Sequence, residues 1–185
     1  MPAGSVAGEP QVLGASTYNF WLDTLLVKTS ANSDIYAISN QTKRKIFSPA
    51  IFNSYAGYWQ SLKLNTVSLG YLNSIPDTNL IKTSDGPRVY ILSNGFKRPI
   101  ASAEIFNSYG FEWDKIATIN QVEMDSYIPA ALIKHGVDLY RLNPNGAINY
   151  FPSMKILMKD GYNAKDAAEI NDFEFENYIK GSPMI

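Results

Sequence analysis

The sequence contains no cysteine and a single histidine, His135, among its 185 residues. Without cysteine the chain cannot form disulfides or thiolate metal sites, and it cannot use a cysteine nucleophile. One imidazole is too few for a histidine-rich zinc site, and a serine-histidine-acid triad would depend on His135 alone. The sequence also lacks a phosphate-binding loop, a dinucleotide fingerprint and a G-x-S-x-G motif. We therefore expect no metal, no cofactor and no enzymatic activity.

The sequence also has no excess of charge of one sign and no long apolar run. Lysine and arginine number 16 and the acidic residues 17, which gives a net charge of -1. Nucleic-acid binding is not expected from such a balance. No stretch approaches the roughly 18 consecutive apolar residues that cross a bilayer, so no membrane span is expected. At 45% hydrophobic residues, the chain is apolar enough to bury a core.

Glycine, alanine, serine and proline dominate the beginning of the chain, which reads MPAGSVAGEPQVLGAS. This composition is typical of a flexible linker, or of a mature chain from which an export signal has been removed. We interpret residues 1–23 as a linker and lead-in, and we expect an exported protein that acts outside the cell or at its surface.

One segment of the sequence occurs twice with few changes. Residues 25–59 align without a gap with residues 79–113, and both copies contain the pentapeptide IFNSY. A more divergent third copy begins with ALIKHGVDLYRLNPNG, and its ending, INDFEFENYI, mirrors INQVEMDSYI in the second copy. The sequence therefore predicts three tandem units, at residues 24–77, 78–130 and 131–185.

Each unit is expected to contain three short antiparallel strands and two short helices. In the second unit, residues 80–83 and 89–92 have the β-branched and aromatic composition of strands. An Asn-Gly pair then predicts a hairpin that leads into a third strand at residues 97–100. Because Pro99 has no N–H, we expect this third strand at the edge of its sheet.

Similar capping residues mark the helix boundaries in every unit. The first helix begins at a serine N-cap and ends at a glycine: Ser48 and Gly57, Ser102 and Gly110, Ser153 and Gly161. The second helix begins with a capping-box pattern in two units: Asn120 with Glu123, and Asn171 with Glu174. The units are joined by short connectors without Gly/Ser stretches. We therefore predict an α+β fold of three quasi-equivalent units packed into one body.

The pentapeptide IFNSY lies on the first predicted helix. In the second unit Ile105, Phe106 and Tyr109 share one apolar face, whereas Asn107 and Ser108 point elsewhere. The third unit does not repeat the polar pair. We therefore interpret IFNSY as a core-packing and helix-termination segment rather than a ligand motif.

Aromatic residues follow IFNSY in both units: Tyr58 and Trp59 in the first, Phe111 and Trp113 in the second. Exposed rings beside polar groups suit sugars, whose apolar faces stack on them, so these four residues are candidate binding residues. The alternative is that they fill the space between helices. Solvent exposure of Trp59 and Trp113 separates the two interpretations.

A basic cluster on the third strand is the other candidate binding site. Lys43 and Arg44 in the first unit recur as Lys97 and Arg98 in the second. Cations on an edge strand can bind phosphates or uronates. Charges in such positions also serve to block aggregation of the edge, and this alternative stays open.

Paired carboxylates would be needed for a glycosidase. The second unit offers Glu104, Glu112, Asp114, Glu123 and Asp125. Glu123 is expected to act in a capping box, and Glu104 lies in the first turn of a helix, where the dipole favours an acid. A carboxylate-dependent hydrolase is therefore the weakest hypothesis.

The second unit, LIKTSDGPRVYILSNGFKRPIASAEIFNSYGFEWDKIATI, resembles tandem repeats of about fifty residues in predicted secreted or surface proteins of small-genome, largely uncultivated bacteria. The resemblance is strongest over residues 80–127 and weakest in the third unit. Repeats of this kind accompany other extracellular modules, including cell-wall-processing ones. The resemblance therefore implies a role in attachment or recognition, and it implies no catalytic residues.

The leading hypothesis is a non-enzymatic extracellular or cell-surface repeat module that binds a cell-wall or surface glycan, or anchors to the envelope. Tandem units with recurring aromatic and basic positions would offer multivalent contact. The main alternative is a structural or protein-protein interaction module, such as a surface-layer-like building block with a surface protein as partner. The sequence leaves the oligomeric state open.

Overall fold

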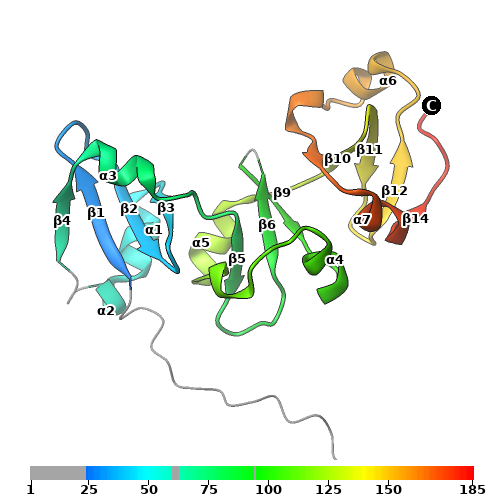
Figure 1. The fold of residues 1–185 in the computed structure, drawn as a ribbon. Coiled ribbons are helices and arrows are strands. Elements are labelled where there is room, and N and C mark those ends of the chain that lie inside the picture. The colour runs from blue at the N-terminus through cyan, green and yellow to red at the C-terminus, as the bar shows by residue number, and fades with distance from the viewer. Residues whose placement is uncertain (1–23, 60–62, 94) are drawn as a thin grey trace, which may run out of the picture.

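The computed structural model describes residues 24–59, 63–93 and 95–185. The predicted lead-in at residues 1–23 and the side chains of Tyr58 and Trp59 lie outside this part. The described chain has a mixed α+β architecture, as the sequence predicts, with sheets of four, five and five strands and short helices between the strands. The three sheets follow one another in a row along the chain (Figure 1).

The first sheet has the strand order β3-β2-β1-β4. Its strands are β1 (Leu25–Thr29), β2 (Ile35–Ser39), β3 (Thr42–Ile46) and β4 (Leu64–Val67). Three helices accompany it: α1 (Pro49–Ser54), α2 (Ala56–Trp59) and α3 (Leu69–Ser74).

The second sheet has the strand order β8-β5-β6-β7-β9. Its strands are β5 (Leu80–Thr83), β6 (Tyr90–Ser93), β7 (Phe96–Pro99), β8 (Ala117–Ile119) and β9 (Ile128–Pro129). Its helices are α4 (Ala103–Ser108), the 3-10 helix η1 (Trp113–Lys115) and α5 (Gln121–Ser126).

The third sheet has the order β13-β10-β11-β12-β14. Its strands are β10 (Leu132–His135), β11 (Asp138–Leu142), β12 (Ala147–Tyr150), β13 (Ala168–Glu169) and β14 (Ile179–Lys180). Its helices are α6 (Met154–Lys159), the 3-10 helix η2 (Ala164–Asp166) and α7 (Asp172–Asn177).

The three consecutive antiparallel strands predicted for each unit are present in each sheet. Sequence analysis missed short strands that pair in parallel on either side of them. In the second sheet β8 pairs with β5 and β9 pairs with β7. The expectation that the strand containing Pro99 forms an edge is therefore wrong: β9 pairs beside Phe96 and Lys97, and Pro99 lies beyond that pairing. Strands of two or three residues, such as β8 and β9, are too short to show a periodic pattern.

Each face of the second sheet is covered by its own helix. Neighbouring residues of a strand point to opposite faces, so Leu80 packs with Phe106 of α4, whereas Ile81 packs with Met124 of α5. The third sheet repeats this arrangement with two separate buried clusters. Among the described residues each buried cluster belongs to one sheet, and the first two sheets share an edge-to-face contact of Phe47 with Tyr127, whose ring centroids are 6.2 Å apart.

The predicted helix starts are confirmed. Ser48, Ser102 and Ser153 each accept a hydrogen bond from the N–H three residues later, and so do Asn120 and Asn171. Two details differ from the prediction. Gly57 lies inside α2 rather than ending a helix. The Glu123 side chain does not complete a capping box; it contacts residues of the first sheet instead.

A buried ion pair joins the first sheet to the second. Glu123 on α5 is 1% exposed, and its carboxylate accepts from Nε of Arg44 on β3 at 2.9 Å. Tyr55, at the end of α1, donates its hydroxyl to the other carboxylate oxygen at 2.5 Å and accepts from the backbone N–H of Asn120 at 2.9 Å. The side-chain amide of Asn120 donates to the Ser54 hydroxyl at 2.8 Å. We call these five residues the first junction.

The same contacts occur between the second and third sheets. Glu174 on α7 pairs with Arg98 on β7 and accepts the Tyr109 hydroxyl at 2.5 Å. Asn171 donates its backbone N–H to Tyr109 at 3.1 Å and its amide to the Ser108 hydroxyl at 2.9 Å. We call this set the second junction. The last two residues of IFNSY therefore contact the following sheet, which the interpretation as core packing had missed.

Electrostatics in both junctions favour the charged pair and the neutral tyrosine. Burial is the largest single influence and lowers the pKa of Arg44, but the charges and hydrogen bonds of Glu123 and Tyr55 together outweigh it, so the pKa of Arg44 is raised. Burial, together with the hydrogen bond to Glu174, raises the pKa of Tyr109 to about 12. The tyrosine thus remains a hydrogen-bond donor at any physiological pH.

Substitution of Glu123 by Gln tests the first junction. The change leaves the buried Arg44 cation without a counter-charge, so we expect the free energy of unfolding to fall by about 3 kcal/mol. Urea denaturation followed by circular dichroism measures this. The matched control, Glu112→Gln at an exposed position, should change it by less than about 0.5 kcal/mol. Equal effects of the two substitutions would contradict a buried, charge-dependent junction.

Candidate ligand-binding site

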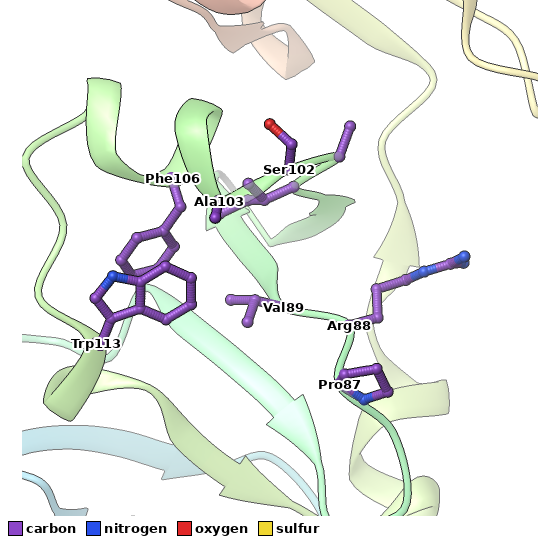
Figure 2. Close-up of a pocket in the computed structure, with 9 residues that line it drawn as sticks. Pro87, Arg88, Val89, Ser102, Ala103, Phe106 and Trp113 are labelled. Carbon is purple, nitrogen blue, oxygen red and sulfur yellow. The ribbon is translucent and has the colours of Figure 1, made fainter. Parts of the chain in front are cut away.

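A hollow of about 280 Å³ lies beside Trp113 on the second sheet. It is lined by residues 87–89, which lead into β6, by residues 100–103, which lead into α4, and by Phe106 and Trp113. Figure 2 shows the rings of Trp113 and Phe106 on one side, Val89 in the middle, and Pro87 with Arg88 at the other end. The Arg88 side chain extends away from Trp113 (Figure 2).

The Trp113 ring is exposed and held in place at the same time. Its residue is 53% exposed, and its ring stacks on buried Phe106 with 3.9 Å between centroids and an interplanar angle of 26°. The indole Nε1 donates to Oδ1 of Asn107 at 3.1 Å. A ring that is fixed before a ligand arrives loses little conformational entropy on binding.

The other predicted aromatic residues do not line this hollow. Phe111 is half-buried and packs against Phe106 and Tyr109, with centroids 5.5 Å and 5.0 Å away. The side chains of Tyr58 and Trp59 lie outside the described residues. Of the predicted aromatic candidates that the structure describes, Trp113 is therefore the one that meets solvent beside a hollow.

The predicted basic cluster does not form an exposed patch. Arg44 and Arg98 are 4% and 1% exposed and belong to the two junctions. Lys97 donates to the carbonyl of Met124 at 2.6 Å, and Lys43 is paired with Asp77 at 3.1 Å. The two strands that carry them, β3 and β7, are each contacted by later segments of the chain, and no local sequence pattern indicates such contacts.

A second hollow, of about 400 Å³, borders Trp113 as well and reaches the first sheet. Asn40, in the turn between β2 and β3, forms part of its wall and donates to the carbonyl of Ile116 at 2.7 Å. Gln41 accepts from Lys115 at 2.7 Å. Both turn residues have positive φ, 52° for Asn40 and 59° for Gln41; asparagine tolerates this conformation, whereas it is unfavourable for glutamine. Their contacts with the second sheet hold this turn in place.

The sequence did not indicate several of the lining residues as site residues, among them Asn40, Lys82 and Arg88. Lys82 lies on a strand that recurs in all units, and Arg88 precedes a strand without any recognisable motif. The only distinguishing signal is that Arg88 differs from its counterparts, Asp34 and Asp138, in the aligned units.

The acidic and histidine candidates are spread over the molecule. Glu123 is buried in the first junction, whereas Asp114 borders the second hollow. His135 contacts Asp172 through Nε2 at 2.7 Å and stacks on Phe175. Among the described residues, no group of three or more His, Cys, Asp or Glu side chains is placed to hold a metal ion.

No protein-family model matches the chain, and no curated protein matches it. Among solved structures, the chain is similar to the structure of the periplasmic assembly from the ESX-5 inner membrane complex, with a TM-score of 0.27 and 8% sequence identity. The similarity covers 87% of this chain and 66% of that chain. A TM-score this low does not support any inference about function. Within residues 24–59, 63–93 and 95–185, no helix is long and apolar enough to cross a membrane.

Replacing Trp113 by Ala should leave the protein folded. Because half of the residue is exposed, we expect the free energy of unfolding to fall by only about 1 kcal/mol, mainly from lost stacking on Phe106. The comparison variant Phe111→Ala removes a ring packed between two others and should cost about 3 kcal/mol. Chemical denaturation of both variants measures the difference. A cost for Trp113→Ala as large as that for Phe111→Ala would show that Trp113 belongs to the core.

Proposed function

We propose that the chain is a non-enzymatic module that acts outside the cell or at its surface and binds a cell-wall or surface glycan at Trp113. The observation that carries this proposal is the exposed, braced indole ring beside a hollow. The apolar face of a pyranose ring stacks on such a ring, and polar groups at the edge of the hollow can bind its hydroxyls.

Several features support binding rather than catalysis. Glu123 and Glu174, the buried acids, have their carboxylates engaged by arginine and tyrosine in the junctions. His135 lies on the third sheet, and Asp114 is an acid at the second hollow beside Trp113. A glycosidase needs two carboxyl groups facing one scissile bond, so a carboxylate-dependent hydrolase is the least supported alternative.

We further propose that the scaffold consists of three quasi-equivalent units, at residues 24–77, 78–130 and 131–185, packed into one body. In each sheet the same three antiparallel strands follow one another, flanked by a parallel strand beside the first of them. The two junctions use the same residue types in the same places. Units of this size stabilise one another by stacking.

The junctions also favour a second candidate function, a structural or protein-protein interaction module. A polar, geometrically specific contact fixes the relative orientation of neighbouring units, which is what a spacer or an assembly component needs. A module of this kind would have a surface protein as its partner. The stacked units would then present surfaces to that partner at a fixed spacing, and Trp113 would be part of such a surface.

The third unit lacks the arginine, serine and tyrosine of a junction, and the first unit lacks its asparagine and glutamate. The third unit has Asn149, Lys159 and Asp160 where the second has Arg98, Ser108 and Tyr109. The first unit has Ser68, Tyr71 and Ile75 where the second has Asn120, Glu123 and Tyr127. The first and third units therefore act as caps, and head-to-tail growth through this contact is not expected.

Retention on purified cell-wall sacculi and binding to a glycan array test the leading proposal. The unaltered protein should be retained, and Trp113→Ala should lose most of the retention because the stacking surface is gone. Phe173→Ala, which removes another exposed aromatic side chain on α7, is the matched control and should behave like the unaltered protein. Absence of retention, or equal retention by all three proteins, would refute glycan binding at Trp113.

The capping of the array predicts the state of the protein in solution. Because the described residues of the first and third units do not supply the missing half of a junction, we expect a monomer over a wide range of concentrations. Sedimentation velocity measures this directly. Chains that associate head to tail as the concentration rises would contradict the capping interpretation and would favour a surface-layer-like assembly.

A further inference from the structure

The two hollows beside Trp113 share one wall. Pro87, Val89 and Trp113 line both the hollow of about 280 Å³ and the hollow of about 400 Å³. The first continues past Val89 toward Arg88, and the second continues toward Asn40 on the first sheet. A ligand that lies across the shared wall would therefore reach into both, with its central part at the Trp113 ring.

Each hollow contains a cation that no described residue neutralises. Arg88 lines the first and is exposed, and Lys82 lines the second and is half-buried. Neither side chain makes a hydrogen bond or an ion pair with any residue in the described part of the chain. Asp114 borders the second hollow as well, so cations outnumber acids along the two hollows. This charge distribution favours an anionic ligand over a neutral one.

We infer that the two hollows form one elongated site for a linear glycan that contains uronic acid residues. This inference rests on the proposed function, which places a sugar ring on Trp113. A uronate combines the apolar ring face that stacks on tryptophan with the carboxylate that pairs with lysine or arginine. A polyol phosphate would supply the charge without the ring.

The site belongs to two units rather than one. Lys82, Arg88 and Trp113 come from the second sheet, whereas Asn40 comes from the first. Asn40 is kept near Ile116 by its own hydrogen bond, and the first junction fixes the two sheets relative to each other. The binding surface thus spans a boundary between units, which suits a polymer longer than one or two rings.

Isothermal titration calorimetry with oligogalacturonates tests this inference on the full chain. We expect the hexasaccharide to bind at least about tenfold more tightly than the disaccharide, because only the longer chain reaches both hollows. A fully methyl-esterified hexasaccharide has the same rings without the charges and should bind about tenfold more weakly. Lys82→Gln and Arg88→Gln should each weaken binding of the acidic hexasaccharide about threefold to tenfold. Lys155→Gln, an exposed lysine on α6, is the control and should have no effect.

The outcomes separate this inference from the proposed function. Equal binding of the acidic and esterified chains, equal binding of the disaccharide and hexasaccharide, or no binding of any oligogalacturonate would overturn the elongated uronate site. If Trp113→Ala still abolishes retention on sacculi in those cases, glycan binding itself stands. If the protein binds no oligogalacturonate and Trp113→Ala leaves retention unchanged, both proposals fail.

Discussion

A carboxylate buried between neighbouring sheets is the interaction on which the arrangement of this protein depends. The apolar clusters each belong to one sheet, so the sheets have little shared core to align them. Glu123 and Glu174 supply that alignment by accepting from an arginine and a tyrosine of the preceding sheet. Among the described residues, Nη2 of Arg44 and Nε of Arg98 are buried without a hydrogen-bond partner. Unsatisfied donors reduce the net stability that such a buried pair can contribute.

Orientation of the first two sheets matters because the candidate site lies at their boundary. Asn40 and Gln41 adopt left-handed backbone conformations in the first sheet and contact Ile116 and Lys115 beside η1. The second unit has glycine at the position of Gln41, so the strained residue in the first unit has a contact that glycine could not make. Strain in this turn is therefore offset by its contacts with the segment that carries Trp113. The junction and the turn together determine the shape of the second hollow.

Local features of the fold could be predicted from the sequence, and relations between distant segments could not. Serine and asparagine caps and the three antiparallel strands arise from neighbouring residues, and they are present where the sequence placed them. The partner of Arg44 lies on α5, and no local pattern connects the two. Glu123 even fitted a capping box, which hid its role in the junction. Trp113 could be predicted as a candidate, whereas Lys82 had no signal and Arg88 only its difference from the aligned Asp34 and Asp138, because their position beside Trp113 depends on the folded sheet.

The junction residues recur between the aligned segments of the chain, whereas some of the residues beside the hollow differ. Arginine, serine and tyrosine recur in the first two units, and asparagine, glutamate and tyrosine recur in the last two, as a contact between successive units requires. Around the hollow, Phe106 and Trp113 align with Phe52 and Trp59 of the first unit, whereas Arg88 aligns with Asp34 and Asp138. At the matching place on the third sheet a smaller hollow of about 160 Å³ has Asp138 where the second sheet has Arg88, and Ala164 follows α6 where Trp113 follows α4. The repeated IFNSY segment therefore contributes to the scaffold through its helix and its junction contacts, whereas the charge beside the hollow differs between the aligned segments.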